Sequence, residues 1–334
     1  MKQIIIGIHG LGNKPSAHIL KEWWLKSIKE GLENTGKSRN NIPFELVHWA
    51  DILNEDPLDM NVKENDDPLH ISEPYVQGTS TKRDDDASMR IKVLQYIEDQ
   101  LDKIFLNNDF TINFKNVTDK IIHRYFTELD TYYGENSTSI IDKEFTAKES
   151  IQNRLSSLLA KYKNHNILLI AHSMGSIIAF DVLSNLSDQY SINTFVTIGS
   201  PLGLPVIGGR IFAEQKLLNS DLTKPATPNS ISKNWYNMSD SLDKIALDHT
   251  LSDDFDANNI GIKAIDISVY NNYEINNESN PHKSFGYLRT PELATIIDGF
   301  LKRKRSDNYY QIYKSLQKSI SDKLNTFKNI LKRK

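Results

Sequence analysis

The sequence of 334 residues contains no cysteine. This absence excludes a disulfide-stabilised scaffold, a thiolate metal site and a cysteine nucleophile, because each of them needs a thiol. No apolar run approaches the roughly 18 residues that a membrane-spanning helix needs. The N-terminal apolar run, Ile4–Ile8, is too short for a secretory signal, and no small-residue cleavage site follows it. We therefore expect a cytoplasmic protein that is soluble or attached to a membrane only peripherally.

Several kinds of binding motif are also missing. The sequence contains no internal repeat, no spacing of metal ligands, no glycine loop of the nucleotide-binding kind and no nucleic-acid module. The basic run Lys302–Arg305 is too short to indicate nucleic-acid binding by itself. We expect no cofactor, no metal and no nucleic-acid partner. With 39% hydrophobic and 25% charged residues, the composition is that of a globular chain, which excludes wholesale disorder.

Short apolar runs alternate with helical patterns along much of the chain. Apolar residues recur at helical spacing over 20–32 and 151–162, which predicts helices there. The apolar runs themselves are continuous, as in strands that are covered on both faces. These runs are Gln3–Ile8, Phe44–Trp49, Asn166–Ala171, Asn193–Gly199, Trp235–Met238 and Ile262–Tyr270. The alternation predicts an α/β protein with a mainly parallel, doubly wound sheet.

Residues 52–140 interrupt this alternation, because they contain no convincing buried strand. The stretch begins with polar residues, including the run Asp84–Asp86, which predicts a solvated loop rather than a calcium site. Two amphipathic helical patterns follow, at 91–104 and 121–129. Two interpretations stay open: a helical decoration packed on the edge of the sheet, or a cap that covers a binding cleft.

One segment combines a buried strand, a turn with small residues and an apolar helix. The strand Asn166–Ala171 is followed by His172-Ser173-Met174-Gly175 and then directly by the helical pattern. A serine hydroxyl is a weak nucleophile, and a sharp strand-to-helix turn exposes it beside a base. Ala171 and Gly175 are small, as the crowding of backbones at such a turn requires. Ser173 is the candidate nucleophile, and a structural serine that caps a core helix is the alternative.

A tetrahedral intermediate needs two preorganised donors for its oxyanion. The backbone amide of Met174, directly after Ser173, is one candidate. The turn His9-Gly10-Leu11-Gly12 at the end of the first strand offers the second, and the amide of Leu11 is its most plausible donor. We interpret His9 as a structural residue that holds this turn, and His172 as a residue that packs against or orients the turn at Ser173.

Together these segments resemble the α/β-hydrolase superfamily, specifically its esterase- and lipase-like members. The resemblance rests on His9–Gly12, Ala171–Gly175 and Gly199-Ser200-Pro201. It implies an α/β-hydrolase domain over 1–304, with a core at about 1–51 and 141–304 and a helical insertion, or cap, at about 52–140. The chain departs from the family pattern in two ways. Alanine replaces the usual first glycine of the nucleophile turn, and the insertion precedes that turn.

The resemblance also implies a chain order of nucleophile, acid and histidine. Asp243 matches the acid position of the family, Asp240 is the runner-up and Asp266 is a third choice. Only His249 and His282 follow the acid in the sequence. His282 comes after the last predicted strand, where a loop can hold a general base above the carboxyl edge of the sheet. We therefore expect His282 to be the general base and acid and Asp243 to orient it.

These residues predict a serine hydrolase that cleaves carboxylic esters, of a lipid or acyl-ester type, through an acyl-enzyme. The substrate would be a small-molecule or lipid ester. Aromatic residues of the insertion would line an acyl pocket or belong to the core; they are Tyr125, Phe126, Tyr132 and Tyr133. The same triad serves thioesterases, amidases and acyltransferases, which the sequence does not separate. One alternative is a non-catalytic binding or scaffold protein with the same fold, and another is a peripheral membrane or partner-binding protein that uses the basic C-terminal segment.

The net charge of −3 is the average of two unlike parts. Residues 302–334 carry 11 lysines and arginines against 2 acidic residues, a net charge of +9, and the other 301 residues carry −12. Apolar residues recur in this tail at helical spacing: Ile312, Leu316, Ile320, Leu324, Phe327 and Leu331. The pattern predicts a basic amphipathic helix at 305–334. We expect it to dock on the core or in a homodimer, and peripheral membrane contact is the alternative.

Overall fold

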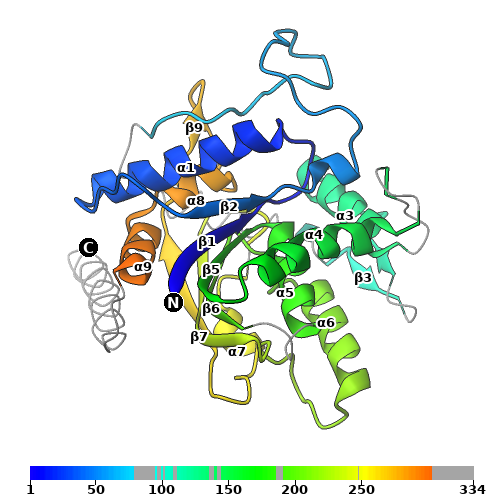
Figure 1. The fold of residues 1–334 in the computed structure, drawn as a ribbon. Helices are drawn as coiled ribbons and strands as arrows, with labels where there is room; N and C mark the ends of the chain where they lie inside the picture. Colours follow the sequence, from blue (N-terminus) through cyan, green and yellow to red (C-terminus); the bar gives the residue numbers. More distant parts are fainter. Residues whose placement is uncertain are drawn as a thin grey trace, which may run out of the picture.

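The computed structural model describes residues 1–78, 95, 99–100, 102–107, 111–134, 139–140, 144–185, 191–246 and 248–302. Six parallel strands form its central sheet (Figure 1). Their order across the sheet is β2 (Phe44–Val47), β1 (Lys2–Ile8), β5 (His165–His172), β6 (Ile192–Ile198), β7 (Ile231–Asp240) and β8 (Ala264–Val269). All six predicted strands are present and parallel, which confirms the predicted fold class.

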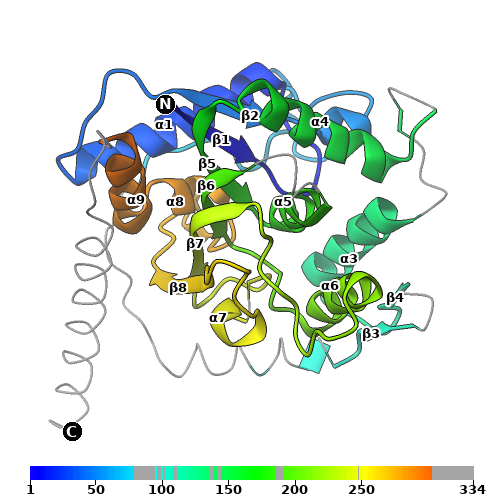
Figure 2. The same ribbon diagram turned by 60° about the horizontal axis from the view of Figure 1, so that its bottom comes forward.

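Helices cover both faces of this sheet (Figures 1 and 2). One face carries α1 (Ala17–Asn34), α8 (Ser284–Leu288) and α9 (Pro291–Leu301). The other carries α3 (Lys120–Tyr133), α4 (Ala147–Lys161), α5 (Met174–Asn185) and α6 (Pro205–Leu218). Short helices also follow β2 and β7, namely η1 (Ala50–Ile52) and α7 (Leu251–Asp254).

The two faces of the sheet belong to two separate apolar cores. In β1, Ile6 and Ile8 pack with the buried residues of α4 and α5, whereas Ile5 packs with those of α1, α8 and α9. Side chains of successive strand residues point to opposite faces, so a strand that is covered on both sides must be apolar throughout. Trp24 of α1 is fully buried against the sheet. The continuous apolar runs of the sequence have this physical origin.

Helix α5 is buried on all sides. Every residue from Met174 to Leu183 is buried, including Ser176 and Asp181. A helix without a polar face is stable only where other elements surround it. Because α5 directly follows the central strand β5, the turn between them lies in the middle of the sheet's carboxyl edge.

Helix α3 confirms the second helical pattern predicted within residues 52–140. Most of the first pattern, at 91–104, lies outside the described residues, as does the run Asp84–Asp86. A two-stranded antiparallel hairpin, β3 (Phe105–Leu106) with β4 (Ile112–Asn113), was not expected and is separate from the main sheet. Two residues per strand are too few to produce a recognisable pattern.

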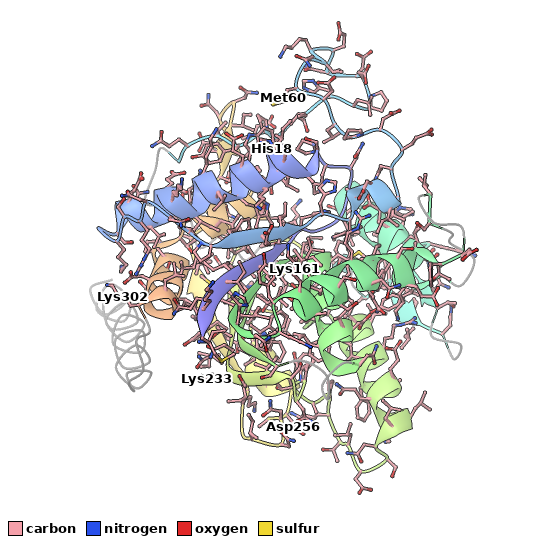
Figure 3. The ribbon with its side chains drawn as sticks, in the orientation of Figure 1. His18, Met60, Lys161, Lys233, Asp256 and Lys302 are labelled. Atoms are coloured by element: carbon pink, nitrogen blue, oxygen red, sulfur yellow. The ribbon has the colours of Figure 1, made fainter. Side chains whose placement is uncertain are left out.

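The earlier part of the insertion forms a loop that rises above α1 (Figure 1). Met60 lies on this loop, and its side chain is about half exposed (Figure 3). The predicted basic helix at 305–334 lies outside the described residues, so it stays a prediction. Within the part of the chain that the structure describes, no helix is both long and apolar enough to cross a bilayer.

Candidate active site

Ser173 occupies the sharp turn between β5 and α5. Its φ angle is +53°, in the left-handed region that non-glycine residues rarely adopt. The glycines around it are required by close packing. A Cβ added to Gly10 would lie 2.6 Å from the Cβ of Ser173, and one added to Gly175 would lie 2.7 Å from the carbonyl oxygen of His9. The turn is therefore strained and tightly enclosed, as a strand-to-helix turn that presents a nucleophile is expected to be.

The structure brings three predicted residues together at this turn. The Nε2 atom of His282 lies 2.9 Å from the Oγ atom of Ser173. On the other side of the ring, Nδ1 lies 2.9 Å from both carboxylate oxygens of Asp243. Asp243 follows β7, and His282 lies between the short strand β10 (Glu278–Ser279) and α8. These residues are far apart in the sequence and meet because parallel strands end at one edge of the sheet.

Asp243 is fully buried and is held by several donors. Its Oδ2 accepts a hydrogen bond from the hydroxyl of Tyr287 at 2.7 Å, and its Oδ1 accepts from the amide of Ile245 at 2.9 Å. Burial by itself raises the pKa of Asp243. The neighbouring His282 and the hydrogen bonds from His282, Tyr287 and Ile245 outweigh this effect, so the net pKa lies below its ordinary value. The carboxylate is therefore ionised and able to stabilise a protonated imidazole.

The carboxylates of the other two candidate acids accept hydrogen bonds mainly from backbone amides. The carboxylate of Asp240 accepts from the amides of Leu242, at 2.8 Å, and Asn271, at 2.7 Å. Asp266 accepts from the side chain of Asn237, at 2.9 Å, and from two amides at the start of α7. The geometry thus separates Asp243 from both alternatives.

Gly199 lies directly after β6 and packs against the Asp243–His282 pair. Its φ angle is +55°. A Cβ at this position would lie 2.9 Å from Oδ2 of Asp243 and 3.3 Å from Nδ1 of His282. Any side chain at Gly199 would clash with Asp243 and His282 and would disturb the hydrogen bond between them. Gly199 begins the Gly199-Ser200-Pro201 motif that contributed to the family resemblance, so the sequence did carry a signal for it.

The loop that carries His282 is held from several directions. His172 donates from Nε2 to the carbonyl oxygen of His282 at 2.7 Å. The side-chain oxygen of Asn280 accepts from the amide of His282 at 3.0 Å, and Asn271 donates to the carbonyl of Pro281 at 2.7 Å. Burial, followed by the nearby His282, lowers the pKa of His172 well below its ordinary value, so the ring is neutral. His172 thus holds the base loop in addition to flanking Ser173.

Glu73, from the insertion, also contacts this loop. Its carboxylate accepts from the side-chain amide of Asn280 at 2.6 Å and from the ammonium group of Lys283 at 2.9 Å. These two residues flank His282 on either side. Burial would raise the pKa of Glu73, but Lys283 and these hydrogen bonds outweigh it and lower the pKa. The sequence analysis did not identify Glu73, because no local pattern connects it to a loop about 200 residues later.

The turn after β1, which carries the candidate oxyanion donor Leu11, is held by His9. His9 donates from Nδ1 to the carbonyl of Gly10 at 2.8 Å, while its Nε2 accepts from the amide of Trp49 at 3.0 Å. In a trans peptide the carbonyl and the following N–H point in opposite directions. The amide of Leu11 therefore points away from the His9 ring, and the preceding Gly10 packs against Ser173. Among the described residues, the amides of Leu11 and Met174 have no acceptor.

A cavity of about 570 Å³ contains Ser173 and His282. Its apolar wall includes Trp23 and Trp24 of α1 and Phe285 of α8. Both halves of the insertion also contribute to the lining: Leu58, Pro68, His70, Ile71, Ser72, Glu73, Tyr125 and Glu128. Of the two interpretations of the insertion, the cap over a cleft agrees with this lining.

Glu128 connects the insertion to the candidate oxyanion turn. Its Oε2 accepts from the amide of Gly12 at 2.6 Å. Helix α3 is therefore attached to the turn that carries Leu11. No group of three or more potential metal ligands occurs within the described residues.

Comparison with known families agrees with this architecture. A family model described as a PGAP1-like alpha/beta domain matches residues 100–276, just over half of the chain. The matched range includes Ser173 and Asp243, begins after the His9–Gly12 turn and ends before His282. The comparison with curated proteins gives no match. The parallel sheet and the matched family together confirm the resemblance to α/β hydrolases, and the chain belongs to the PGAP1-like alpha/beta domain family.

Proposed function

We propose that this protein is a serine hydrolase that cleaves carboxylic esters, of a lipid or acyl-ester type, through an acyl-enzyme. The family supports hydrolase chemistry in general. The observation that carries the finer proposal is the alignment of His282 between Ser173 and Asp243, with 2.9 Å on each side of the ring. This is the arrangement in which an imidazole can take the proton of a serine hydroxyl while a carboxylate fixes its tautomer.

In the first half of the reaction, the Oγ atom of Ser173 attacks the ester carbonyl carbon and its proton passes to Nε2 of His282. The carbonyl oxygen becomes an oxyanion, which the amides of Leu11 and Met174 would bind. The carbon–oxygen bond to the alcohol then breaks, and the alcohol oxygen takes the proton from His282. The acyl group stays on Ser173.

In the second half, a water molecule attacks the acyl carbon and gives its proton to His282. The bond between the acyl carbon and Oγ breaks, His282 returns the proton to Ser173, and the carboxylic acid leaves. Asp243 stabilises the imidazolium that forms twice in this cycle. It does not itself need to take up a proton, because its lowered pKa keeps it ionised.

Substitution of the nucleophile tests the proposal directly. We expect Ser173→Ala to abolish both hydrolysis of p-nitrophenyl butyrate and labelling by a fluorophosphonate probe. Ser284→Ala is the matched control, since Ser284 is buried and lines the same cavity; this variant should still be labelled. Undiminished labelling of S173A would refute the proposal. Ester, thioester and amide substrates with one common acyl group then define the reaction class.

The choice of acid is tested by two isosteric variants. We expect Asp243→Asn to lower kcat by about 10³–10⁴-fold, since it removes the group that fixes the tautomer of His282. Asp240→Asn loses the acceptor for one of the two amides of Leu242 and Asn271 but leaves Asp243 and His282 unchanged, so its effect on kcat should be much smaller. An equal loss in the two variants would contradict the assignment of Asp243.

A further inference from the structure

Helix α3 contributes Tyr125 and Glu128 to the cavity that contains Ser173. The two residues are three positions apart and therefore lie on the same side of the helix. Glu128 already has a clear role, because it accepts from the amide of Gly12. Within the described part of the chain, the hydroxyl of Tyr125 has no such partner, although Tyr125 lines the same cavity as the proposed nucleophile.

The hydroxyl of Tyr125 is buried without a hydrogen-bond partner among the described residues. Only 5% of the side chain is exposed. Leaving a buried hydroxyl unpaired is unfavourable, and native structures do so rarely and usually where a ligand or water completes the bond. Burial, with smaller contributions from Glu128 and Asp243, raises the pKa of Tyr125 well above its ordinary value. The group is therefore a neutral hydroxyl that can donate to an acceptor.

The ring of Tyr125 is packed against a neighbouring aromatic residue. Its ring packs edge-on against Phe126, with 5.4 Å between the ring centroids, and Phe126 in turn contacts Phe114 at 6.0 Å. The bond from Gly12 to Glu128 ties the same helix to the oxyanion turn. A rigid tyrosine loses little conformational entropy when it binds a ligand, so it makes an effective contact.

The lining includes a second buried donor without an acceptor among the described residues. This donor is the indole Nε1–H of Trp24, which is fully buried on α1. An indole N–H can only donate. The residues that line the cavity thus supply apolar surface and include two with unpaired donors, and this combination suits an apolar ligand that carries acceptor oxygens.

The position of Tyr125 indicates which part of an ester it would contact. During cleavage His282 gives its proton to the leaving alcohol, so the alcohol must lie on the side of His282. A second cavity of about 720 Å³ adjoins the first on that side, and the residues that line both are His70, Ser72, Glu73, Ile245, Asn280 and His282. Ser173 and Tyr125 line only the first cavity. The acyl group, which stays attached to Ser173, is therefore the part closer to Tyr125.

We propose that the hydroxyl of Tyr125 donates a hydrogen bond to an acceptor oxygen within the acyl group of the substrate, beyond the scissile ester. The chemical class is thus an ester whose acyl chain carries an ether, hydroxyl or carbonyl oxygen. This inference rests on the proposed ester hydrolysis at Ser173. Tyr125 acts here as a specificity-determining residue, and it takes no part in bond breaking.

Matched esters test this specificity. The probes are p-nitrophenyl hexanoate and a series in which one chain methylene at a time is replaced by an ether oxygen. We expect the wild-type protein to hydrolyse at least one ether ester with a kcat/KM about tenfold above that of hexanoate, and Tyr125→Phe to reduce this ratio to about one. Tyr133→Phe is the control, because Tyr133 lies on the same helix with a buried, unpaired hydroxyl but does not line the cavity.

Two results would overturn the inference. One is a wild-type protein that hydrolyses none of the ether esters better than p-nitrophenyl hexanoate. This result can be observed without any variant. The other is an unchanged ratio in Y125F. Fluorophosphonate labelling at Ser173 separates this failure from failure of the proposed function: labelled proteins with unchanged ratios reject only the role of Tyr125, whereas proteins that neither label nor hydrolyse any ester reject both.

Discussion

The imidazole of His172 donates to the backbone carbonyl of His282, with 2.7 Å between Nε2 and the oxygen. His172 ends strand β5 and directly precedes Ser173, so this bond joins the two segments that carry the proposed nucleophile and base. We expect His172→Phe to slow hydrolysis of p-nitrophenyl butyrate about tenfold, because it leaves the carbonyl unpaired and loosens the base loop. His172→Gln places an amide donor in a similar position and should restore much of the rate. Equal rates in the two variants would contradict this role.

Glu73 supports the base loop from the insertion, since Asn280 and Lys283 both donate to it. We expect Glu73→Ala to lower kcat about five- to tenfold at nearly constant KM, because the loss affects the alignment of His282 and not the binding of substrate. Steady-state kinetics with p-nitrophenyl butyrate measures the two parameters.

Two further variants define the origin of this effect. Glu73→Gln keeps an acceptor for Asn280 but loses the charge that faces Lys283, so its kcat should be intermediate. Glu64→Ala removes an exposed acid from the same segment and should leave kcat unchanged. A rise in KM without loss of kcat in E73A would show that Glu73 contacts substrate instead.

Gly175 allows α5 to pass close to β1. A Cβ there would meet backbone oxygens of His9 at 2.7 Å and Ile8 at 2.8 Å, which cannot move aside easily. We expect Gly175→Ala to reduce the free energy of unfolding by about 1–3 kcal/mol, visible as a fall of roughly 2–6 °C in Tm. Gly208→Ala is the control within a helix, since its nearest new contact is 3.7 Å away. It should raise Tm slightly, because alanine favours helix over glycine. A G175A protein as stable as G208A would disagree with the observed packing.

Asp181 makes stability depend on pH. It is buried in α5, where burial outweighs the attraction of Lys148 and raises its pKa to about 6. An aspartate in the unfolded chain ionises near pH 4. Its contribution to stability is therefore complete below about pH 4 and is lost as the pH rises through 6.

The isosteric variant Asp181→Asn isolates this contribution. It stays neutral and still accepts from Tyr132, whose hydroxyl lies 3.0 Å from the carboxylate. Relative to wild type, D181N should gain up to about 3 kcal/mol in free energy of unfolding at pH 8 and almost nothing at pH 4. Denaturant titrations at pH 4, 6 and 8 measure this difference. A difference that does not vary with pH would exclude Asp181 as its source.

The sheet was predictable because its central strands are covered on both faces, which leaves continuous apolar runs. The predicted strand boundaries were less accurate where helices cover a strand incompletely. In β7 the predicted run Trp235–Met238 covers less than half of Ile231–Asp240, because the early residues are polar: Ser232 and Asn234 are half-buried and Lys233 is exposed. The β3–β4 hairpin left no signal, since it contributes only two residues per strand and adds nothing to the main core.

The three residues at the centre of the site could be predicted from chain order, since each follows a strand that ends at one edge of the sheet. The residues that the insertion supplies could not. Glu73, Tyr125 and Glu128 reach the site through contacts between distant segments, and their local surroundings resemble any polar loop or amphipathic helix. The sequence alone therefore does not predict site residues whose role depends on how one distant segment packs against another.

Helix α5 has no solvent-facing side between Met174 and Leu183. Most substitutions along it must change the amount of folded protein before they change chemistry. In a mutational scan that records abundance and activity together, substitutions along α5 should lower both. Substitutions at His282 should lower activity and leave abundance nearly unchanged. We therefore expect substrate preference to change through substitutions in the elements around this helix, among them the insertion that lines the cavity.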